Sequence, residues 1–290
     1  MENESERFKD AKMTSILGIL GNIFLMIIKG IVGFATKSQA MIADFANSLS
    51  DIFSSLLTYV GNKIASKPQD NEHNLGHGKA EYIFSFLISI CMIYLSYTMI
   101  KSSVISLIEK KESIYSIWLI AVTIVTIVVK FLLFCYTDRI SKKYNNILVE
   151  ANAKDHRNDC LIELVNLTSI ILSKIGFYFA DGIGGVLISI YILYGGLELF
   201  KRCFDILMDK CIDEKKKDEV IKIIESHKEI KKYQHFNSTP VGYKYQISIS
   251  IFVDGNMSTF ESHKIADDLE NEIIQKVPEV YLAIIHVNPI

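Results

Sequence analysis

The sequence has little cysteine, which cross-links small folds, and little proline, which interrupts helices. Of its 290 residues four are proline and five are cysteine, and no two cysteines show CxxC or CxxH spacing. That scatter argues against a disulfide framework and against a thiolate zinc site. The chain also lacks a glycine-rich phosphate loop and a nucleophile beside a base, so we do not predict an enzyme.

An excess of basic charge is absent as well. Lys and Arg together number 31 against 33 Asp and Glu, and the resulting net charge of −2 argues against a nucleic-acid partner. Half of the residues are hydrophobic. That share is typical of a protein that crosses the bilayer several times and carries a soluble part.

Six stretches are predicted to be membrane helices. Each is long enough to cross about 30 Å of hydrocarbon, although charge interrupts the second and fifth and the last is rich in glycine. They are 13–35, 39–65, 81–108, 114–136, 147–174 and 177–206. Lys and Arg gather before the first stretch and after the second, fourth and sixth. The positive-inside rule therefore predicts a multi-pass protein of the cell membrane with both termini in the cytoplasm.

Towards the C-terminus the pattern becomes that of a soluble α+β domain. A helix is predicted over 213–227, a half-buried strand over 245–253, and a second helix after the capping-box pair Ser258 and Glu261. A core of about eighty residues is marginal alone, so we expect dimerisation. The predicted parts are a cytoplasmic N-terminal segment, a six-helix transmembrane domain and a cytoplasmic α+β domain, over 1–12, 13–210 and 211–290.

Two of the predicted membrane helices carry oxygen-bearing pairs at helical spacing. The stretch "ADFANSLSD" holds Asn47 and Asp51, and "EANAKDHRND" holds Asp155 and Asp159. A spacing of four residues places both members of a pair on one helix face. A charged side chain at bilayer depth costs roughly 2.5–3.5 kcal/mol on insertion scales, so these groups are expected to face protein, water or a ligand. Two such helices would offer four oxygen ligands to one divalent cation.

A second interpretation of both pairs stays open. Neighbouring groups such as Arg157, His156 or Lys130 could satisfy the carboxylates, or the pairs could lie near a water-exposed helix end. Matching pairs on two helices favour the cation site, because ionisable groups inside membrane helices generally mark a transport path. Lys130 itself is interpreted as an ion-paired or snorkelling lysine.

These motifs resemble the cation diffusion facilitators, which are dimeric exporters of divalent metals. The likeness rests on "ADFANSLSD", "DNEHNLGHGKAE", "AKDHRND" and the α+β tail, and it covers nearly the whole chain. It implies a membrane metal site made of Asn47, Asp51, Asp155 and Asp159. It also implies a homodimer with a ferredoxin-like, metallochaperone-like cytoplasmic domain, and export by alternating access with protons as the counter-ion.

The resemblance also bears on the metal. Zinc-transporting members of that family carry one or two histidines in the four-residue site, whereas this sequence has none there. Carboxylate and amide oxygens suit Mn, Mg and Ca, while imidazole suits Zn, Cu and Ni. We therefore predict the manganese-type branch, with Mn(II) as substrate and no cofactor. The alternatives are an exporter of Zn(II), Fe(II) or Co(II), and a membrane-anchored metal sensor or scaffold with a structural tetrad.

A secondary site is predicted in the loop after the second helix. His73 and His77 are four residues apart, with Asp70 three residues before His73, and the three form a candidate divalent-metal cluster. The alternative is a turn shaped by glycines, with histidines that cap helices. In the family some members bind metal here, and the resemblance further suggests that Lys79 pairs with Asp209 as an interlock near the dimer seam.

The cytoplasmic tail resembles the domain that holds a binuclear, mainly histidine site in zinc-transporting members. His235, His263 and His286 fall at matching places. Ser248, however, stands where a histidine is expected, and Asn288 stands where an aspartate is expected. With two ligands replaced, these histidines are either a weakened metal site or ordinary surface and core residues. Dimerisation through the domain does not depend on which is correct.

Overall fold

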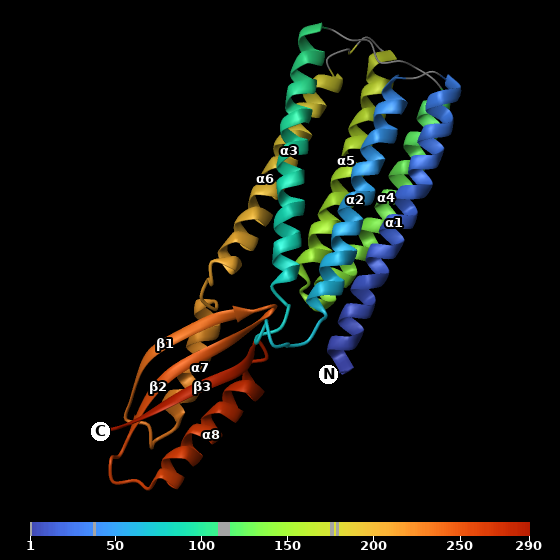
Figure 1. Cartoon of the computed structure of the whole chain (residues 1–290). Helices are drawn as coiled ribbons and strands as arrows, with labels where there is room; N and C mark the ends of the chain where they lie inside the picture. Colours follow the sequence, from blue (N-terminus) through green and yellow to red (C-terminus); the bar gives the residue numbers. More distant parts are fainter. Residues whose placement is uncertain (1, 37–38, 110–116, 175–176, 178–179) are drawn as a thin grey trace. The chain divides into compact units, whose positions relative to one another are not determined.

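The computed structural model contains six long helices followed by a smaller α+β part (Figure 1). It describes all residues except 1, 37–38, 110–116, 175–176 and 178–179. The helices are α1 (Glu2–Thr36), α2 (Gln39–Ala65), α3 (Ala80–Glu109), α4 (Ile117–Tyr144), α5 (Ile147–Lys174) and α6 (Ala180–Leu207). The predicted fold class is confirmed. α1 begins at Glu2 and therefore includes most of the polar N-terminal segment predicted as cytoplasmic.

The chain forms two compact units. The first holds Met1–Ser66 and Ala80–Phe204, and the second holds Lys67–Lys79 and Asp205–Ile290. The loop between α2 and α3 therefore belongs with the α+β part, as does the end of α6. Hydrophobic periodicity alone gave no sign that this loop would group with the tail.

Helix pairs build the first unit. α1 packs along α2, α4 packs along α5, and α5 also contacts α2 and α3 (Figure 1). Among the described residues, four helices are long and apolar enough to cross a membrane, namely Glu6–Ala35, Ala80–Ile108, Ile117–Tyr144 and Gly182–Leu207. α2 and α5 fall short because polar side chains interrupt their apolar runs, as the sequence predicted.

The polar residues of α5 face the interior of the first unit. Asn152 and His156 are 0% exposed and Asn158 is 1% exposed. Large apolar side chains such as Phe131 and Leu132 of α4 point outward instead. This distribution suits a bundle in lipid, where an apolar surface faces the hydrocarbon chains and polar groups gather inside.

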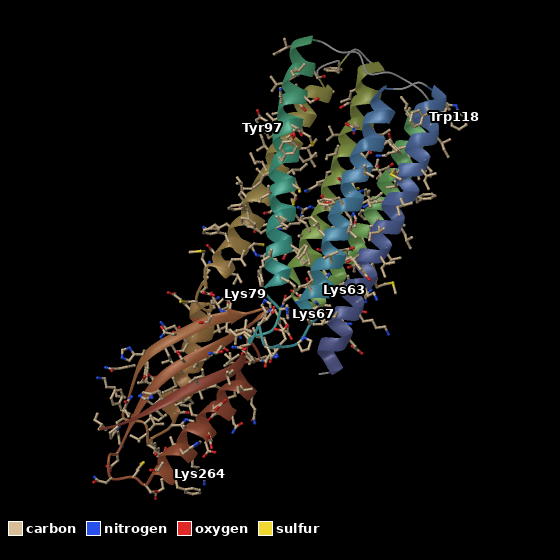
Figure 2. All side chains as sticks on the ribbon, viewed as in Figure 1. Lys63, Lys67, Lys79, Tyr97, Trp118 and Lys264 are labelled. Carbon is tan, nitrogen blue, oxygen red and sulfur yellow. The ribbon has the colours of Figure 1, made fainter. Side chains whose placement is uncertain are left out.

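The two ends of the first unit differ in the side chains that they carry. Lys63 lies toward one end of the helices, while Tyr97 and Trp118 lie toward the other (Figure 2). Both aromatic side chains are exposed. Exposed aromatic residues such as Trp118, at the start of α4, are typical of membrane–water interfaces.

The second unit is a three-stranded sheet with two helices. Its elements are α7 (Glu214–Ser226), β1 (Lys232–Val241), β2 (Lys244–Val253), α8 (Thr259–Lys276) and β3 (Val280–Pro289). The strand order is β1-β2-β3, with β1 antiparallel and β3 parallel to β2. Since a parallel pair needs a crossover connection, α8 links β2 to β3.

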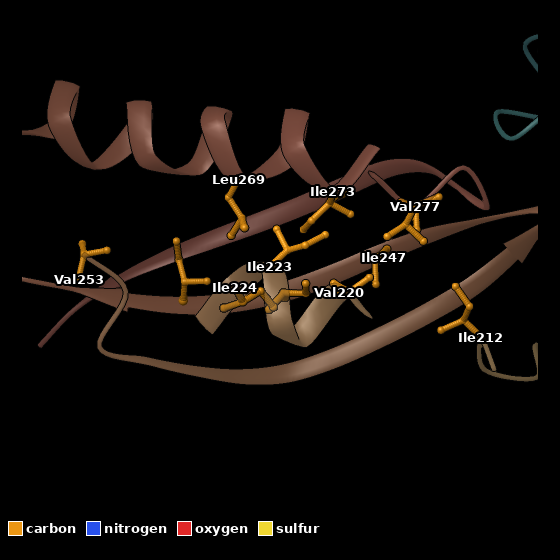
Figure 3. Close-up of a cluster of buried hydrophobic side chains, with 13 residues drawn as sticks. Ile212, Val220, Ile223, Ile224, Ile247, Val253, Leu269, Ile273 and Val277 are labelled. Carbon is orange, nitrogen blue, oxygen red and sulfur yellow. The ribbon is translucent and has the colours of Figure 1, made fainter. Parts of the chain in front are cut away.

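Alternation along β2 builds the core of the second unit. Every second residue is buried, so Ile247, Ile249 and Ile251 face the helices. Leu269 and Ile273 of α8 point into the same cluster, and side chains of α7 complete it (Figure 3). Spacings of two on the strand and four on the helix are those predicted for a half-buried sheet covered by amphipathic helices.

The predicted capping box at the start of α8 is present. The Glu261 backbone N–H donates to Ser258 Oγ at 3.2 Å, and the Ser258 backbone N–H donates to Glu261 Oε2 at 2.9 Å. Both donors would otherwise lack a helical partner. The bond from the Ser258 backbone lowers the pKa of Glu261 below its ordinary value of 4.5.

The capping box predicts an acid-sensitive start of α8. A carboxyl group with a lowered folded-state pKa stabilises the fold above its unfolded pKa, and this contribution is lost as pH falls through the folded value. We expect amide hydrogen exchange in the first turn of α8 to accelerate as pH falls below 4.5, after correction for intrinsic rates. Glu261→Gln should remove this pH dependence. An unchanged profile in that variant would contradict the assignment.

Candidate metal centre

Three carboxylates converge inside the first unit. Asp51 of α2 and Asp155 and Asp159 of α5 each offer one oxygen, and these oxygens lie within 4.8 Å of one another. Asp155 is buried, and the other two side chains are 19% and 14% exposed. Helical geometry brings Asp155 and Asp159 together, because residues four apart on α5 share a face. Packing of α2 against α5 supplies the third group.

The fourth predicted ligand is Asn47. Its backbone belongs to α2, one turn before Asp51. Its side chain lies outside the described residues, as does that of Asp44 in the same helix.

Lys130 of α4 lies among the carboxylates. Its Nζ donates to Asp51 Oδ2 at 2.7 Å and to Asp159 Oδ2 at 2.5 Å. The residue is 2% exposed. The predicted ion pairing of this lysine is therefore confirmed, and snorkelling toward a membrane surface is wrong. Asp155 and Ser54 of α2 line the same cavity as Lys130.

The three carboxylates and Lys130 line a cavity of about 610 Å³. Ile90, Met92 and Leu95 of α3 give it an apolar wall. Two further charged residues line it, Lys29 of α1 and Glu163 of α5, and Lys29 Nζ donates to Glu163 Oε1 at 2.8 Å. Sequence reasoning missed this second ion pair. Its signal was available, because Glu163 follows Asp159 at the same four-residue spacing.

The loop after α2 also brings its predicted residues together. Ligand atoms of Asp70, His73 and His77 lie within 4.8 Å of one another. Asp70 Oδ1 accepts the backbone N–H groups of His73 at 2.7 Å and Glu72 at 3.0 Å, and the former bond lowers the pKa of Asp70. Such a turn around an aspartate is stable without metal. The geometry is thus compatible with both interpretations of the loop.

Comparison with known proteins identifies the chain. The family model described as the cation efflux transmembrane domain matches residues 15–208, and the model described as the cation efflux protein cytoplasmic domain matches 212–290. The chain belongs to the cation efflux family. The resemblance drawn from the sequence motifs is confirmed. As a member, the protein is a multi-pass membrane transporter of divalent cations, with the metal as its substrate.

Several curated proteins are similar over almost their whole length. "Uncharacterized transporter MJ0449" of Methanocaldococcus jannaschii is 31% identical over 97% of this chain and 99% of the relative. "Manganese efflux system protein MneP" of Bacillus subtilis is 26% identical, over 98% of each chain. "Protein p34" of Rickettsia prowazekii is 30% identical over 100% of this chain and 95% of its own.

In this cation efflux protein the loop after α2 is fastened to the rest of the second unit at two places. Lys79 Nζ lies 2.7 Å from Asp209 Oδ1, the pairing that the resemblance suggested. Gly78 lies against Gly242 in the turn between β1 and β2, where a Cβ on Gly78 would be 2.7 Å from the Gly242 Cα. Gly242 has a φ of 61°, which favours glycine. Close backbone approach therefore requires both glycines.

The tail histidines of the cation efflux protein do not come together within one chain. His235 lies in the bulge of β1, His263 on α8 pairs with Asp267 at 3.0 Å, and His286 on β3 lies opposite Ser250. All three are exposed. No metal-holding group among the described residues includes any of them.

Proposed function

We propose that this protein exports Mn(II) from the cytoplasm through the membrane site formed by Asn47, Asp51, Asp155 and Asp159. The observation that carries the proposal is the convergence of three carboxylates from two helices in one cavity. Intramembrane carboxylates are costly unless they serve a transported ion or a partner charge. Similarity to a protein named for manganese efflux supports the choice of metal.

The donor atoms favour a hard divalent cation. In the described part of the chain, the ligand group contains carboxylate oxygens only, and no histidine or cysteine atom belongs to it. His156 follows Asp155 directly but is excluded from the group, and Cys91 lines the same cavity without joining it. Oxygen donors of this kind suit Mn(II) more than Zn(II) or Cu(II).

The proposed transport cycle is alternating access with proton antiport. Carboxylates this close repel one another when all are ionised, so cationic partners such as a divalent ion, protons or the Lys130 ammonium stabilise the set. The metal enters from the cytoplasm, and protons from the outer side replace it after release. Lys63 near one end of the helices and the aromatic residues toward the other support cytoplasmic termini (Figure 2). A homodimer joined through the cytoplasmic domain is also part of this proposal.

Transport in proteoliposomes tests the metal and the counter-ion together. The purified full chain is given Mn(II), Fe(II), Co(II), Zn(II) or Mg(II) while a trapped dye reports internal pH. We expect Mn(II) to move at least about tenfold faster than Zn(II), because oxygen ligands disfavour the softer ion. Metal uptake should be accompanied by proton movement in the opposite direction. Equal rates for zinc would refute the ligand argument, and a constant internal pH would refute the antiport.

The loop cluster of Asp70, His73 and His77 is proposed as a secondary metal site. Its exposure and its two imidazoles predict weaker binding with less preference for manganese. In the same proteoliposomes, His73→Ala with His77→Ala should leave transport by the membrane site intact while removing one bound equivalent of metal. Unchanged metal content in that variant would leave the loop as a structural turn.

A further inference from the structure

Lys130 occupies the position of a cation within the ligand group. Its ammonium bonds two of the three converging carboxylates, Asp51 on one helix and Asp159 on another. With 2% exposure, it belongs to the cavity and not to the bilayer surface. A lysine ammonium is a compact point charge with three donors on a flexible stem. It therefore competes with a metal ion for the same oxygens.

The formal charge of the cavity matches one divalent ion. Four carboxylates and two ammonium groups line it, which leaves a formal charge of −2 when all are ionised. They are Asp51, Asp155, Asp159, Glu163, Lys29 and Lys130. Because uncompensated charge is costly away from water, binding of one divalent cation neutralises the cavity while both lysines stay charged inside it.

Glu163 can accept the Lys130 ammonium when a metal ion displaces it. Glu163 lines the same cavity, and its Oε1 is held by Lys29. Its Oε2 is buried and has no hydrogen-bond partner among the described residues. Glu163 is one helical turn beyond Asp159, and side chains at this spacing are neighbours, with Cβ atoms roughly 5–6 Å apart. Lys130 lines the same cavity, and its flexible stem allows the ammonium to turn from Asp159 toward this neighbour.

We propose that Lys130 is a tethered counter-cation of the metal centre, which fills it in the metal-free state and moves to Glu163 Oε2 when a divalent ion binds. This rests on the proposed function, because it takes the carboxylate group to be the transport site. Two consequences follow. A monovalent ion carries the same charge as the lysine ammonium. Replacing Lys130 with such an ion would add no positive charge at the carboxylates, so monovalent ions are excluded from the metal centre. The returning ammonium also lowers metal affinity and thereby speeds release.

Metal binding and turnover test the proposal together. We compare Mn(II) affinity by calorimetry, and transport rate in proteoliposomes, for the wild type and Lys130→Met. Because the competing charged hydrogen bonds are gone, we expect Mn(II) to bind about ten- to a hundredfold more tightly in the variant. Turnover should fall, and sodium should become an inhibitor. Equal or weaker Mn(II) binding would show that Lys130 is a structural ion-pair partner and would overturn the proposal.

Lys130→Met leaves Asp51 and Asp159 without their cation and so risks misfolding. Lys130→Arg keeps the charge, and its rigid fork holds two carboxylates more firmly than an ammonium does. We expect weaker Mn(II) binding in this variant, opposite in direction to the methionine variant. Unchanged or tighter binding in Lys130→Arg would equally contradict the proposal, whether or not Lys130→Met folds.

A double-mutant cycle tests the movement toward Glu163. Glu163→Gln removes the accepting carboxylate, so Mn(II) binding should weaken more in the wild-type background than in the Lys130→Arg background, where the fork stays on its carboxylates. Additive effects of the two substitutions would exclude movement of Lys130 to Glu163.

Asp155→Asn distinguishes failure of the proposed function from failure of the counter-cation proposal. If that variant still binds and transports Mn(II), the proposed function fails; if it does neither while Lys130 variants bind normally, only the counter-cation proposal fails.

Discussion

Asp155→Asn is expected to abolish Mn(II) transport. The substitution keeps the size and one oxygen of the side chain but removes a negative charge from a group of three carboxylates that lie within 4.8 Å. Losing a supporting partner of a metal site already lowers affinity 10–100-fold, so losing a ligand charge should cost about a hundredfold or more. Initial rates of Mn(II) uptake in proteoliposomes, at matched protein content, give the result.

The matched control for this experiment is Asp138→Asn on α4. Asp138 pairs with Lys142 one turn away at 2.6 Å, and the lysine side chain is 76% exposed. Such an exposed pair contributes little. This variant should transport at nearly the wild-type rate. Comparable loss in both variants would point to a general effect of removing acidic charge, and near-normal transport by Asp155→Asn would refute the assignment of the site.

Glu81→Ala is expected to destabilise the membrane domain severely. Arg7 Nη1 and Nη2 donate to Glu81 Oε1 and Oε2 at 2.5 and 2.7 Å, in a two-bond pairing between α1 and α3. The two side chains are 4% and 3% exposed. Removing one partner of a buried pair costs about 3–5 kcal/mol, because a buried charge loses its compensation. The yield of monodisperse protein and its thermal unfolding midpoint in detergent measure the effect.

A double variant distinguishes loss of the charge pair from loss of packing. Replacing both partners with apolar residues, as in Arg7→Met with Glu81→Leu, avoids an uncompensated charge and should recover most of the lost stability. Asn146 also bonds Glu81 Oε1, at 3.4 Å, and Asn62 Oδ1, at 3.2 Å, so recovery should be incomplete. Equal damage in the single and double variants would mean that these hydrogen bonds, and not the charge pair, determine the stability.

The parts of the site that sequence reasoning predicted are those set by local geometry. Asp155 and Asp159 share a helix face because they are four residues apart, and this requires no knowledge of the fold. The position of Lys130 between Asp51 and Asp159 depends on the packing of three helices, and the residues concerned are 79 and 29 positions apart. The sequence offered Lys130 as one of three possible partners for the carboxylates, but it could not select Lys130 over Arg157 and His156.

The ion pairs that sequence reasoning missed also join residues far apart in the sequence. Arg7 and Glu81 are 74 positions apart, and Lys29 and Glu163 are 134 apart. The spacing of Glu163 from Asp159 places Glu163 on the face of α5 that carries the site, but a single sequence does not show which distant lysine or arginine pairs with it. In the tail, by contrast, alternation along β2 and the capping box of α8 are local patterns, and both were predicted correctly.

The grouping of the α2–α3 loop with the second unit has a mechanical consequence. The polypeptide passes between the two units three times, after Ser66, before Ala80 and after Phe204. Three covalent connections restrict relative movement of the two units more than a single linker would. A displacement of the sheet and its helices therefore pulls on the ends of α2, α3 and α6 at once. Since α2 also carries Asp51, one continuous helix joins this connection to a member of the carboxylate group.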